Sequence, residues 1–184
     1  MSLQQTLVLI KPDGVKKKII GEIIKRIENT GLTIKAMKMI WPDKDFAIKH
    51  YPLDEEWAKA TFEKTKKVSE ENKKPMKFKN HLDFAKTLQK YLADFITESP
   101  IIAMVIEGPH AIEVVRKIIG STEPRQALPG TIRSDFSSIE SYEIADKEQR
   151  AVRNLIHASD SEKNAKREIE LWFSKEEIHD YYSK

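Results

Sequence analysis

The stretch with the clearest potential for chemistry runs from Asn154 to Ser161 and reads Asn-Leu-Ile-His-Ala-Ser-Asp-Ser. A short apolar step brings His157 to the edge of a polar turn, and a helix is expected directly afterwards. Ser159 and Glu162 have the spacing of a capping box, with Ser161 as a competing N-cap. A helix N-terminus offers unpaired N–H groups and partial positive charge, which suit a phosphate beside the ring. His157 could therefore become a phosphorylated nucleophile, although a histidine at a strand end is more often a packing or hydrogen-bonding residue.

Three separated cations, Lys11, Arg116 and Arg133, each lie beside an expected turn or at the end of an expected element. Taken singly, each is more often a member of a surface ion pair. Together with one histidine at a helix N-terminus, they supply the parts that phosphoryl transfer needs: donors spread over the phosphate oxygens, and a nucleophile.

Other chemistries lack their sequence signatures. The Gly-x-x-x-x-Gly-Lys-Ser/Thr loop, the Gly-x-Gly-x-x-Gly fingerprint, Gly-x-Ser-x-Gly and His-Glu-x-x-His are all missing. The five histidines are scattered without helical ligand spacing, and the chain has no cysteine. Disulfide frameworks and thiolate zinc sites are therefore excluded, and a metal site built from protein ligands alone is not expected.

The elements that must position these residues alternate along the chain. Apolar runs predict strands at 6–10, 33–41, 101–106 and at His157. Apolar residues at helical spacing predict helices at 15–30, 43–51, 81–97, 111–119 and 162–173, with 56–68 as a further candidate. Polar excursions are expected at about 53–87 and 137–147, and the lysines of 64–80 favour a solvated surface over a polynucleotide-binding patch. Strand and helix in alternation predict two βαβ halves in one α+β sandwich.

Composition sets the class of protein. The chain has 184 residues, of which 40% are hydrophobic and 33% charged, so we expect a single domain, 1–184, with a real core. The net charge of only +3 gives no indication of nucleic acid or of an anionic membrane. The apolar start is too short for a signal sequence, and no run approaches the ~20 apolar residues of a membrane span. A soluble cytoplasmic protein without a membrane partner is the expectation.

Four ordered segments resemble the nucleoside diphosphate kinase family. The stretch from Asn154 to Ser161 is similar to that family's active-site motif, and Thr-Leu-Val-Leu-Ile-Lys-Pro-Asp-Gly at 6–14 resembles its opening strand. Residues 99–108 resemble its central strand, and Pro-Gly-Thr-Ile-Arg-Ser-Asp-Phe at 129–136 its phosphate loop. The resemblance implies a ferredoxin-like βαββαβ sandwich, in which helices cover a four-stranded antiparallel sheet and the two excursions are insertions.

The resemblance also implies a ping-pong kinase. The γ-phosphate of ATP or another nucleoside triphosphate moves to His157 and then to a different nucleoside diphosphate. Glu168 matches the carboxylate that orients the imidazole, and Tyr51 matches a tyrosine that lies near it. A neutral imidazole held by a carboxylate keeps one lone pair aimed at phosphorus.

Further site residues follow from the same resemblance. Lys11 and Arg133 are expected to hold the transferring phosphoryl group, and Arg116 and Thr122 the next phosphate. Asn154 is expected to reach the ribose and phosphate side. Mg²⁺ is expected to bridge the β- and γ-phosphates mainly through nucleotide oxygens and water, with Asp160 as an outer-sphere candidate.

The sequence departs from the family pattern where the base is bound. Leu88 stands where the family usually has an aromatic residue, whereas Leu92 matches and Ala151, on the opposite side, is small. Either Leu88 packs on the base with less stacking energy, or an insertion residue such as Phe84 replaces the platform. We expect the insertions to alter nucleotide affinity or base preference and to leave the transfer chemistry intact.

Partners and alternatives complete the sequence-based interpretation. Family resemblance implies a homo-oligomer, a hexamer with a tetramer as the alternative, and the apolar tail at 172–182 could pack on a neighbour or cover its own sheet. A single-stranded RNA-binding module is the main rival, but it needs aromatic residues exposed on the sheet, and the strands offer few. His157 could also act as a phosphate donor to other proteins.

Overall fold

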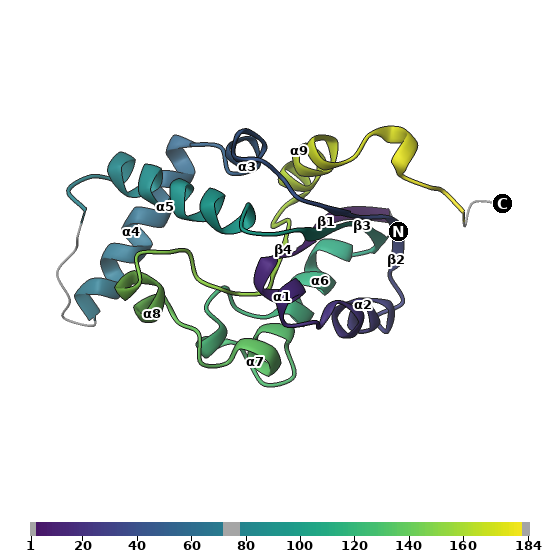
Figure 1. The fold of residues 1–184 in the computed structure, drawn as a ribbon, viewed down its shortest axis with the longest axis horizontal. Helices are drawn as coiled ribbons and strands as arrows, with labels where there is room; N and C mark the ends of the chain where they lie inside the picture. The colour runs from purple at the N-terminus through teal and green to yellow at the C-terminus, as the bar shows by residue number, and fades with distance from the viewer. Residues whose placement is uncertain (1–2, 72–77, 182–184) are drawn as a thin grey trace.

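The computed structural model describes residues 3–71 and 78–181, and within that part of the chain it contains a four-stranded antiparallel sheet (Figure 1). The strands are β1 (Leu3–Ile10), β2 (Thr33–Ile40), β3 (Ile101–Pro109) and β4 (Ile156–Ala158). Their order in space is β2-β3-β1-β4, so the first strand is central and pairs with the strand that carries His157. The apolar runs of β1 and β3 suit these central positions, because both faces of a central strand are buried.

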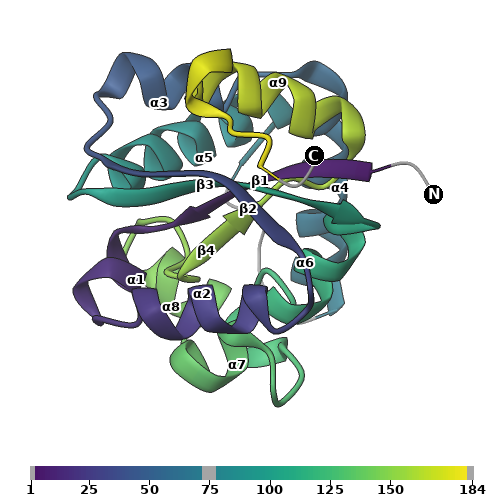
Figure 2. The same ribbon diagram turned by 90° about the vertical axis from the view of Figure 1, so that its right-hand side faces the viewer.

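Helices cover both faces of the sheet (Figure 2). One face carries α3 (Lys44–His50), α5 (His81–Ile96) and α9 (Glu162–Trp172), and α4 (Glu55–Glu71) packs on α5. The other face carries α2 (Ile20–Glu28) and α6 (Ala111–Ile119), with α1 (Pro12–Lys16), α7 (Ile132–Ser137) and α8 (Tyr142–Lys147) on the same side. Two short 3₁₀ turns are η1 (Pro124–Gln126) and η2 (Lys175–Glu177).

The core is divided by the sheet, because successive side chains of a strand point to opposite faces. Leu7 and Leu9 of β1 pack in the layer of α3, α5 and α9, whereas Val8 and Ile10 pack in the layer of α2 and α6. The arrangement confirms the ferredoxin-like βαββαβ sandwich predicted from the sequence. Among the described residues, the side chains exposed on the faces of the sheet include Met37 and Met39 of the edge strand β2 and no aromatic residue of a strand, so the sheet offers no aromatic platform on which RNA bases could stack. Within those residues, no helix is long and apolar enough to cross a membrane.

One local prediction is wrong, and one pair of alternatives is resolved. The helix expected at 15–30 is split into α1 and α2, because Lys18 adopts a left-handed backbone conformation with φ of 59°. The N-cap of α9 is Ser161, whose hydroxyl accepts a hydrogen bond from the backbone N–H of Asn164. Ser159, the other candidate cap, instead uses its hydroxyl to accept from the backbone N–H of Leu7 and to donate to α9.

The two excursions differ in packing. The candidate helix at 56–68 is confirmed as part of α4, while residues 72–77 of the lysine-rich stretch lie outside the described residues. The stretch at 137–147 is packed more closely than its polar composition predicts, because Glu140, Ser141 and Ala145 are buried. Glu140 accepts two hydrogen bonds from Arg150 and one from the backbone N–H of Arg153. This stretch is therefore attached directly to the segment that precedes Asn154.

The tail lies along its own sheet. The backbone N–H of His179 donates to the carbonyl oxygen of Lys35, and the Tyr181 hydroxyl donates to that of Ile34. Trp172 is buried between the sheet and α3. Of the two readings of the apolar tail, the described residues support cover of its own sheet, and Tyr182 lies outside them.

Candidate active site

His157 lies opposite Leu9 of β1 and faces the layer that contains α9. Its Nε2 is 3.0 Å from Oε2 of Glu168, which also accepts a 2.6 Å hydrogen bond from the Ser159 hydroxyl. Burial alone would raise the pKa of Glu168, but hydrogen bonds and charge from His157 hold that pKa below its usual value. An ionised Glu168 accepts a hydrogen bond from Nε2–H, so the lone pair of neutral His157 lies on Nδ1.

A strained turn sets the direction in which the chain enters β4. The backbone N–H of Ile156 donates to the carbonyl of Asn154 at 2.7 Å, which closes a γ-turn centred on Leu155 with φ of 67°. Asp13 Oδ2 accepts from the backbone N–H of Leu155, and the Leu155 carbonyl accepts from the backbone N–H of Lys11. The loop after β1 therefore holds the turn that separates Asn154 from His157.

Gly14 allows this contact. A Cβ atom at position 14 would meet Cγ2 of Ile10 at 2.8 Å and the carbonyl oxygen of Leu155 at 3.0 Å. The first distance is shorter than Cβ contacts in proteins and the second is at their tight limit, so a side chain here would force Ile10 or the turn to shift, and the glycine of the Lys-Pro-Asp-Gly segment favours close approach of the two chain segments.

Lys11 and Asn154 form a buried pair at the end of β1. The Lys11 ammonium donates to Oδ1 of Asn154 at 2.8 Å, and Nδ2 of Asn154 donates to the carbonyl of Thr122 at 2.9 Å. Burial and the neighbouring Arg133 lower the pKa of Lys11 to about 8, against a smaller opposing effect of Asp13. Three of the expected phosphate and ribose contacts, at positions 11, 122 and 154, are thus joined in one hydrogen-bond chain.

Arg133, on α7, is buried and bound to the backbone around the site. Its guanidinium donates to the carbonyl oxygens of Gly120, Asn154 and Ile156 at 2.8, 3.1 and 2.7 Å. Burial lowers its pKa to about 10, which leaves it fully charged at neutral pH. Arg133 therefore ties the loop after α6 to both ends of the γ-turn and brings a positive charge close to His157.

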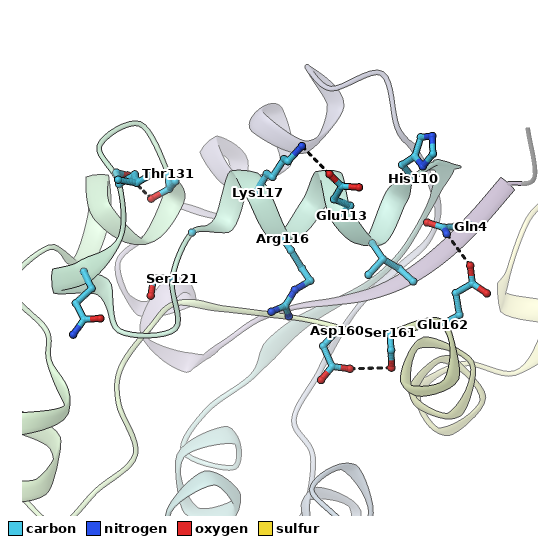
Figure 3. A pocket seen from close by; sticks show the side chains of 14 residues that line it. Gln4, His110, Glu113, Arg116, Lys117, Ser121, Thr131, Asp160, Ser161 and Glu162 are labelled. Carbon is cyan, nitrogen blue, oxygen red and sulfur yellow. Dashed lines mark hydrogen bonds and ion pairs between the residues drawn. The ribbon is translucent and has the colours of Figure 1, made fainter. Parts of the chain in front are cut away.

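Arg116 projects from α6 toward Asp160, which follows β4 (Figure 3). It is exposed, and it lines a groove of about 770 Å³ together with Asp160 and Ser121. Burial alone would raise the pKa of Asp160, but hydrogen bonds from Asn164 and Ser161 and the charge of Arg116 lower it. The groove borders the His157 site through Arg116 and Asp160 and does not include Lys11 or His157.

Tyr51 is the C-cap residue of α3 and lies next to His50. Its ring is 4.5 Å from the ring of His50, which in turn is 4.9 Å from the ring of His157. Burial, with a smaller effect of the Glu168 charge, raises the pKa of the Tyr51 phenol. Its carbonyl accepts from the side chain of Gln89 on α5, so α3 and α5 are fixed to each other here.

The expected base platform lies on α5. Leu88 and Leu92 are half-buried, and Ala151 is buried. Phe84 is not free to replace the missing aromatic residue, because it is buried with its ring against those of Phe62 and Phe78.

One group of side chains in the described residues has the spacing of metal ligands: His50, His157 and Glu168, whose ligand atoms lie within 4.8 Å of one another. Nδ1 of His50, however, accepts a hydrogen bond from Nε1 of Trp172 at 3.1 Å. Neutral His50 therefore carries its proton on Nε2, and it has no second lone pair for a metal. With His50 in this tautomer, the three side chains do not form a metal site.

Sequence reasoning missed Asp13, Ser159 and His50. Asp13 follows the recognised Lys-Pro pair, and its place at the strand end was the available signal. Ser159 was read as a helix cap. His50 precedes Tyr51 in the sequence, but its contact with Trp172, far along the chain, carries no sequence signal.

Comparison with known proteins gives a consistent result. A family model described as nucleoside diphosphate kinase matches residues 4–76 and 63–178. The nucleoside diphosphate kinase of Pyrobaculum aerophilum is 40% identical over 182 residues, covering 97% of this chain and 99% of the relative. That of Pyrococcus furiosus is 43% identical over 179 residues, covering 97% and 88%.

Solved structures of nucleoside diphosphate kinases also superpose on this chain. A crystal structure of an NDP kinase from Pyrobaculum aerophilum superposes with a TM-score of 0.91 at 37% identity, over 97% of this chain and all of that one. A transition state mimic of the Borrelia burgdorferi nucleoside-diphosphate kinase, with bound vanadate and ADP, gives a TM-score of 0.79 at 37% identity, over 97% and 92%.

Proposed function

This chain belongs to the nucleoside diphosphate kinase family, and from that premise we propose how its residues divide the work of the reaction. The enzyme transfers the γ-phosphate of a nucleoside triphosphate to a nucleoside diphosphate by a ping-pong mechanism through a phosphohistidine. The observation that carries the residue assignment is the hydrogen bond between His157 and Glu168, because it leaves Nδ1 of His157 as the nucleophilic atom.

In the first half-reaction, the Nδ1 lone pair of His157 attacks the γ-phosphorus. The N–P bond forms while the bond to the β–γ bridging oxygen breaks, and the diphosphate leaves with that electron pair. The imidazole keeps its proton on Nε2, so its positive charge is stabilised by the carboxylate of Glu168. In the second half-reaction, a terminal oxygen of another diphosphate attacks phosphorus, and the N–P electron pair returns to Nδ1.

The cations are assigned to the phosphates. Lys11 and Arg133 hold the transferring phosphoryl group, and Arg116 and Thr122 hold the adjacent phosphate, with Asn154 at the ribose side. The bridge from Lys11 through Asn154 to the Thr122 backbone supports this assignment, since it fixes three of these groups relative to one another. Charge-assisted donors held in advance stabilise the transition state without reorganisation.

We assign Mg²⁺ as the divalent cation that nucleotide substrates bring. Mg²⁺ prefers oxygen ligands and retains water, so nucleotide phosphates and one carboxylate suffice. Asp160 fits an outer-sphere role, because it is an exposed carboxylate with a lowered pKa beside Arg116, and one of its oxygens is already held by Asn164. When bound, the cation neutralises charge on the phosphate oxygens.

The base is assigned to the space bordered by Leu88, Leu92 and Ala151. We propose that the insertions at about 53–87 and 137–147 alter nucleotide affinity or base preference. Support comes from α4, which packs on the helix that carries Leu88, and from Glu140, which holds the backbone of Arg153 next to Asn154. Deletion of residues 63–79 is expected to change the nucleotide Michaelis constants, and unchanged constants would count against the proposal.

A homo-oligomer is proposed, a hexamer with a tetramer as the alternative. An exposed apolar row on one face of β2 and just beyond it, Met37, Met39 and Trp41, supports a contact with another copy. Light scattering that shows only monomer would refute the assembly. We also propose a cytoplasmic location, where nucleoside triphosphates are made and used, which cell fractionation would test.

The decisive experiment mixes the purified protein with γ-labelled ATP and Mg²⁺. We expect an acid-labile, base-stable phosphohistidine that GDP, CDP or UDP discharges, and no label on His157→Ala. His179→Ala, a histidine change in the tail, is the matched control and should label normally. Label on His157→Ala would show that another residue is the nucleophile.

A further inference from the structure

His50 is the least expected residue beside the nucleophile. It ends α3 and is only 2% exposed. Its Nδ1 accepts the hydrogen bond from Nε1 of Trp172, an indole that can only donate. A lone pair on Nδ1 requires the proton of neutral His50 to lie on Nε2, so one contact with α9 fixes the tautomer of a residue on α3.

The Nε2–H group of His50 is left without a conventional partner. The atom is buried, and no acceptor for it exists among residues 3–71 and 78–181. The His50 ring instead stands at 85° to the ring of His157, with the centroids 4.9 Å apart. Such an edge-to-face contact is attractive between aromatic rings and resists rotation of either ring.

The charges around His50 favour its neutral form. Burial is the main reason that its pKa lies well below the usual value of histidine, and His157, Arg167 and Lys11 lower it further, whereas Glu168 raises it. Tyr51, at 4.5 Å between ring centroids, and Trp172 complete the surroundings without adding charge at neutral pH. A protonated His50 would also present a second N–H to the Trp172 N–H, which removes the hydrogen bond.

We infer that His50 is a positioning residue for His157: Trp172 holds it as a neutral Nε2–H tautomer, edge-to-face with the nucleophile, so that Glu168 binds His157 and not His50. This inference rests on the proposed role of His157. A charged or rotated His50 would compete for the same carboxylate, whose oxygen lies within 4.8 Å of the two histidine nitrogens. The nucleophile would then lose the partner that orients its Nδ1.

The first test needs no mutation. Imidazole ¹⁵N NMR of the whole protein is expected to show one histidine with a protonated Nε2 and an unprotonated Nδ1 that does not titrate between pH 5 and 8, with Trp172→Phe assigning the signal. A His50 proton on Nδ1, or ordinary titration, would overturn the inference even if every variant failed to fold.

The second test measures single-turnover labelling of His157 by γ-labelled ATP. His50→Phe removes the Nδ1 atom by which Trp172 holds the ring edge-to-face with His157. The unanchored ring should lower the labelling rate about tenfold, within the range that misplacement of a reacting group causes, with little change in nucleotide Kd. Trp172→Phe should lower the rate more at acidic than at alkaline pH, because loss of the indole N–H leaves Nδ1 of His50 free to accept a proton. His179→Gln is the control histidine variant.

The outcomes distinguish failure of the proposed kinase function from failure of the positioning role of His50. No label on the parent protein would refute the proposed function itself. Label on the parent, together with His50→Phe and Trp172→Phe profiles identical to it, would refute only the positioning role of His50. Equal losses at every pH for Trp172→Phe would also overturn the inference, since general loosening of the core has no reason to depend on protonation of His50.

Discussion

Lys11 should destabilise the nucleotide-free protein, so replacing it with methionine should stabilise the fold while removing activity. Its pKa falls from an ordinary 10.5 to about 8, chiefly through burial. At about 1.4 kcal/mol for each unit between these values, keeping the buried ammonium charged at pH 7 costs about 3 kcal/mol. Lys11→Met removes this cost but also the hydrogen bond to Asn154, which offsets about 1–2 kcal/mol. The expected net gain at pH 7 is about 1–2 kcal/mol.

The sign of the pH dependence follows from linkage. Below pH 8 both the folded and the unfolded chain hold the Lys11 proton, and the folded state bears the full cost. Between about pH 8 and 10.5 the unfolded chain holds more protons, so the parent protein gains stability as the pH rises. Near pH 10 most of the cost is gone, while the bond to Asn154 remains, so the parent should match or exceed Lys11→Met.

Urea unfolding followed by tryptophan fluorescence at pH 7 and pH 10 would measure both differences. Protomer concentration must be held fixed, because association would add to the apparent stability. Lys25→Met, which changes an exposed lysine on α2, should show a small difference that does not vary between the two pH values. The reasoning would be refuted by a Lys11→Met protein that is less stable than the parent at pH 7, or by a difference independent of pH.

Three further changes probe other parts of the site. Glu168→Gln should slow labelling of His157 about 10- to 100-fold in single-turnover assays, because a charge-assisted hydrogen bond is worth about 1.5–3 kcal/mol; an unchanged rate would remove its orienting role. Leu88→Phe should tighten ADP binding about two- to tenfold, from about 0.5–1.5 kcal/mol of added stacking, and calorimetry showing weaker binding would place the base elsewhere. Glu140→Ala should destabilise the fold by about 1–3 kcal/mol and raise nucleotide Michaelis constants through the freed backbone of Arg153; a thermal scan and steady-state kinetics check both effects.

The parts of the fold that the sequence predicted are those with local causes. The apolar runs of β1 and β3 and the helical periodicity of α6 and α9 each depend on residues close together in the chain. His157 was found for the same reason, since a histidine between an apolar step and a helix N-terminus is visible in eight consecutive residues. Glu168 lies close to His157 because α9, which carries Glu168, begins only five residues after His157.

The parts that were missed depend on distant contacts. Ser159 was a good local cap, but its hydroxyl is used by Leu7 and Glu168, so Ser161 caps the helix instead. Lys18 interrupts a regular helical pattern because the chain must turn between β1 and α2, and lysine gives no warning of a left-handed conformation. Phe84 was an attractive base platform until its two phenylalanine neighbours were seen to bury it.

The position of β1 between β3 and β4 has a consequence for synthesis on the ribosome. β1, with Lys11 at its end, leaves the ribosome well before β4 and α9. Until they do, one edge of β1 has no strand beside it, and the buried lysine has no Asn154 to bind. A nascent or prematurely terminated chain that ends before Asn154 therefore lacks both the partner of Lys11 and His157, and it presents an open apolar edge of the kind that chaperones protect.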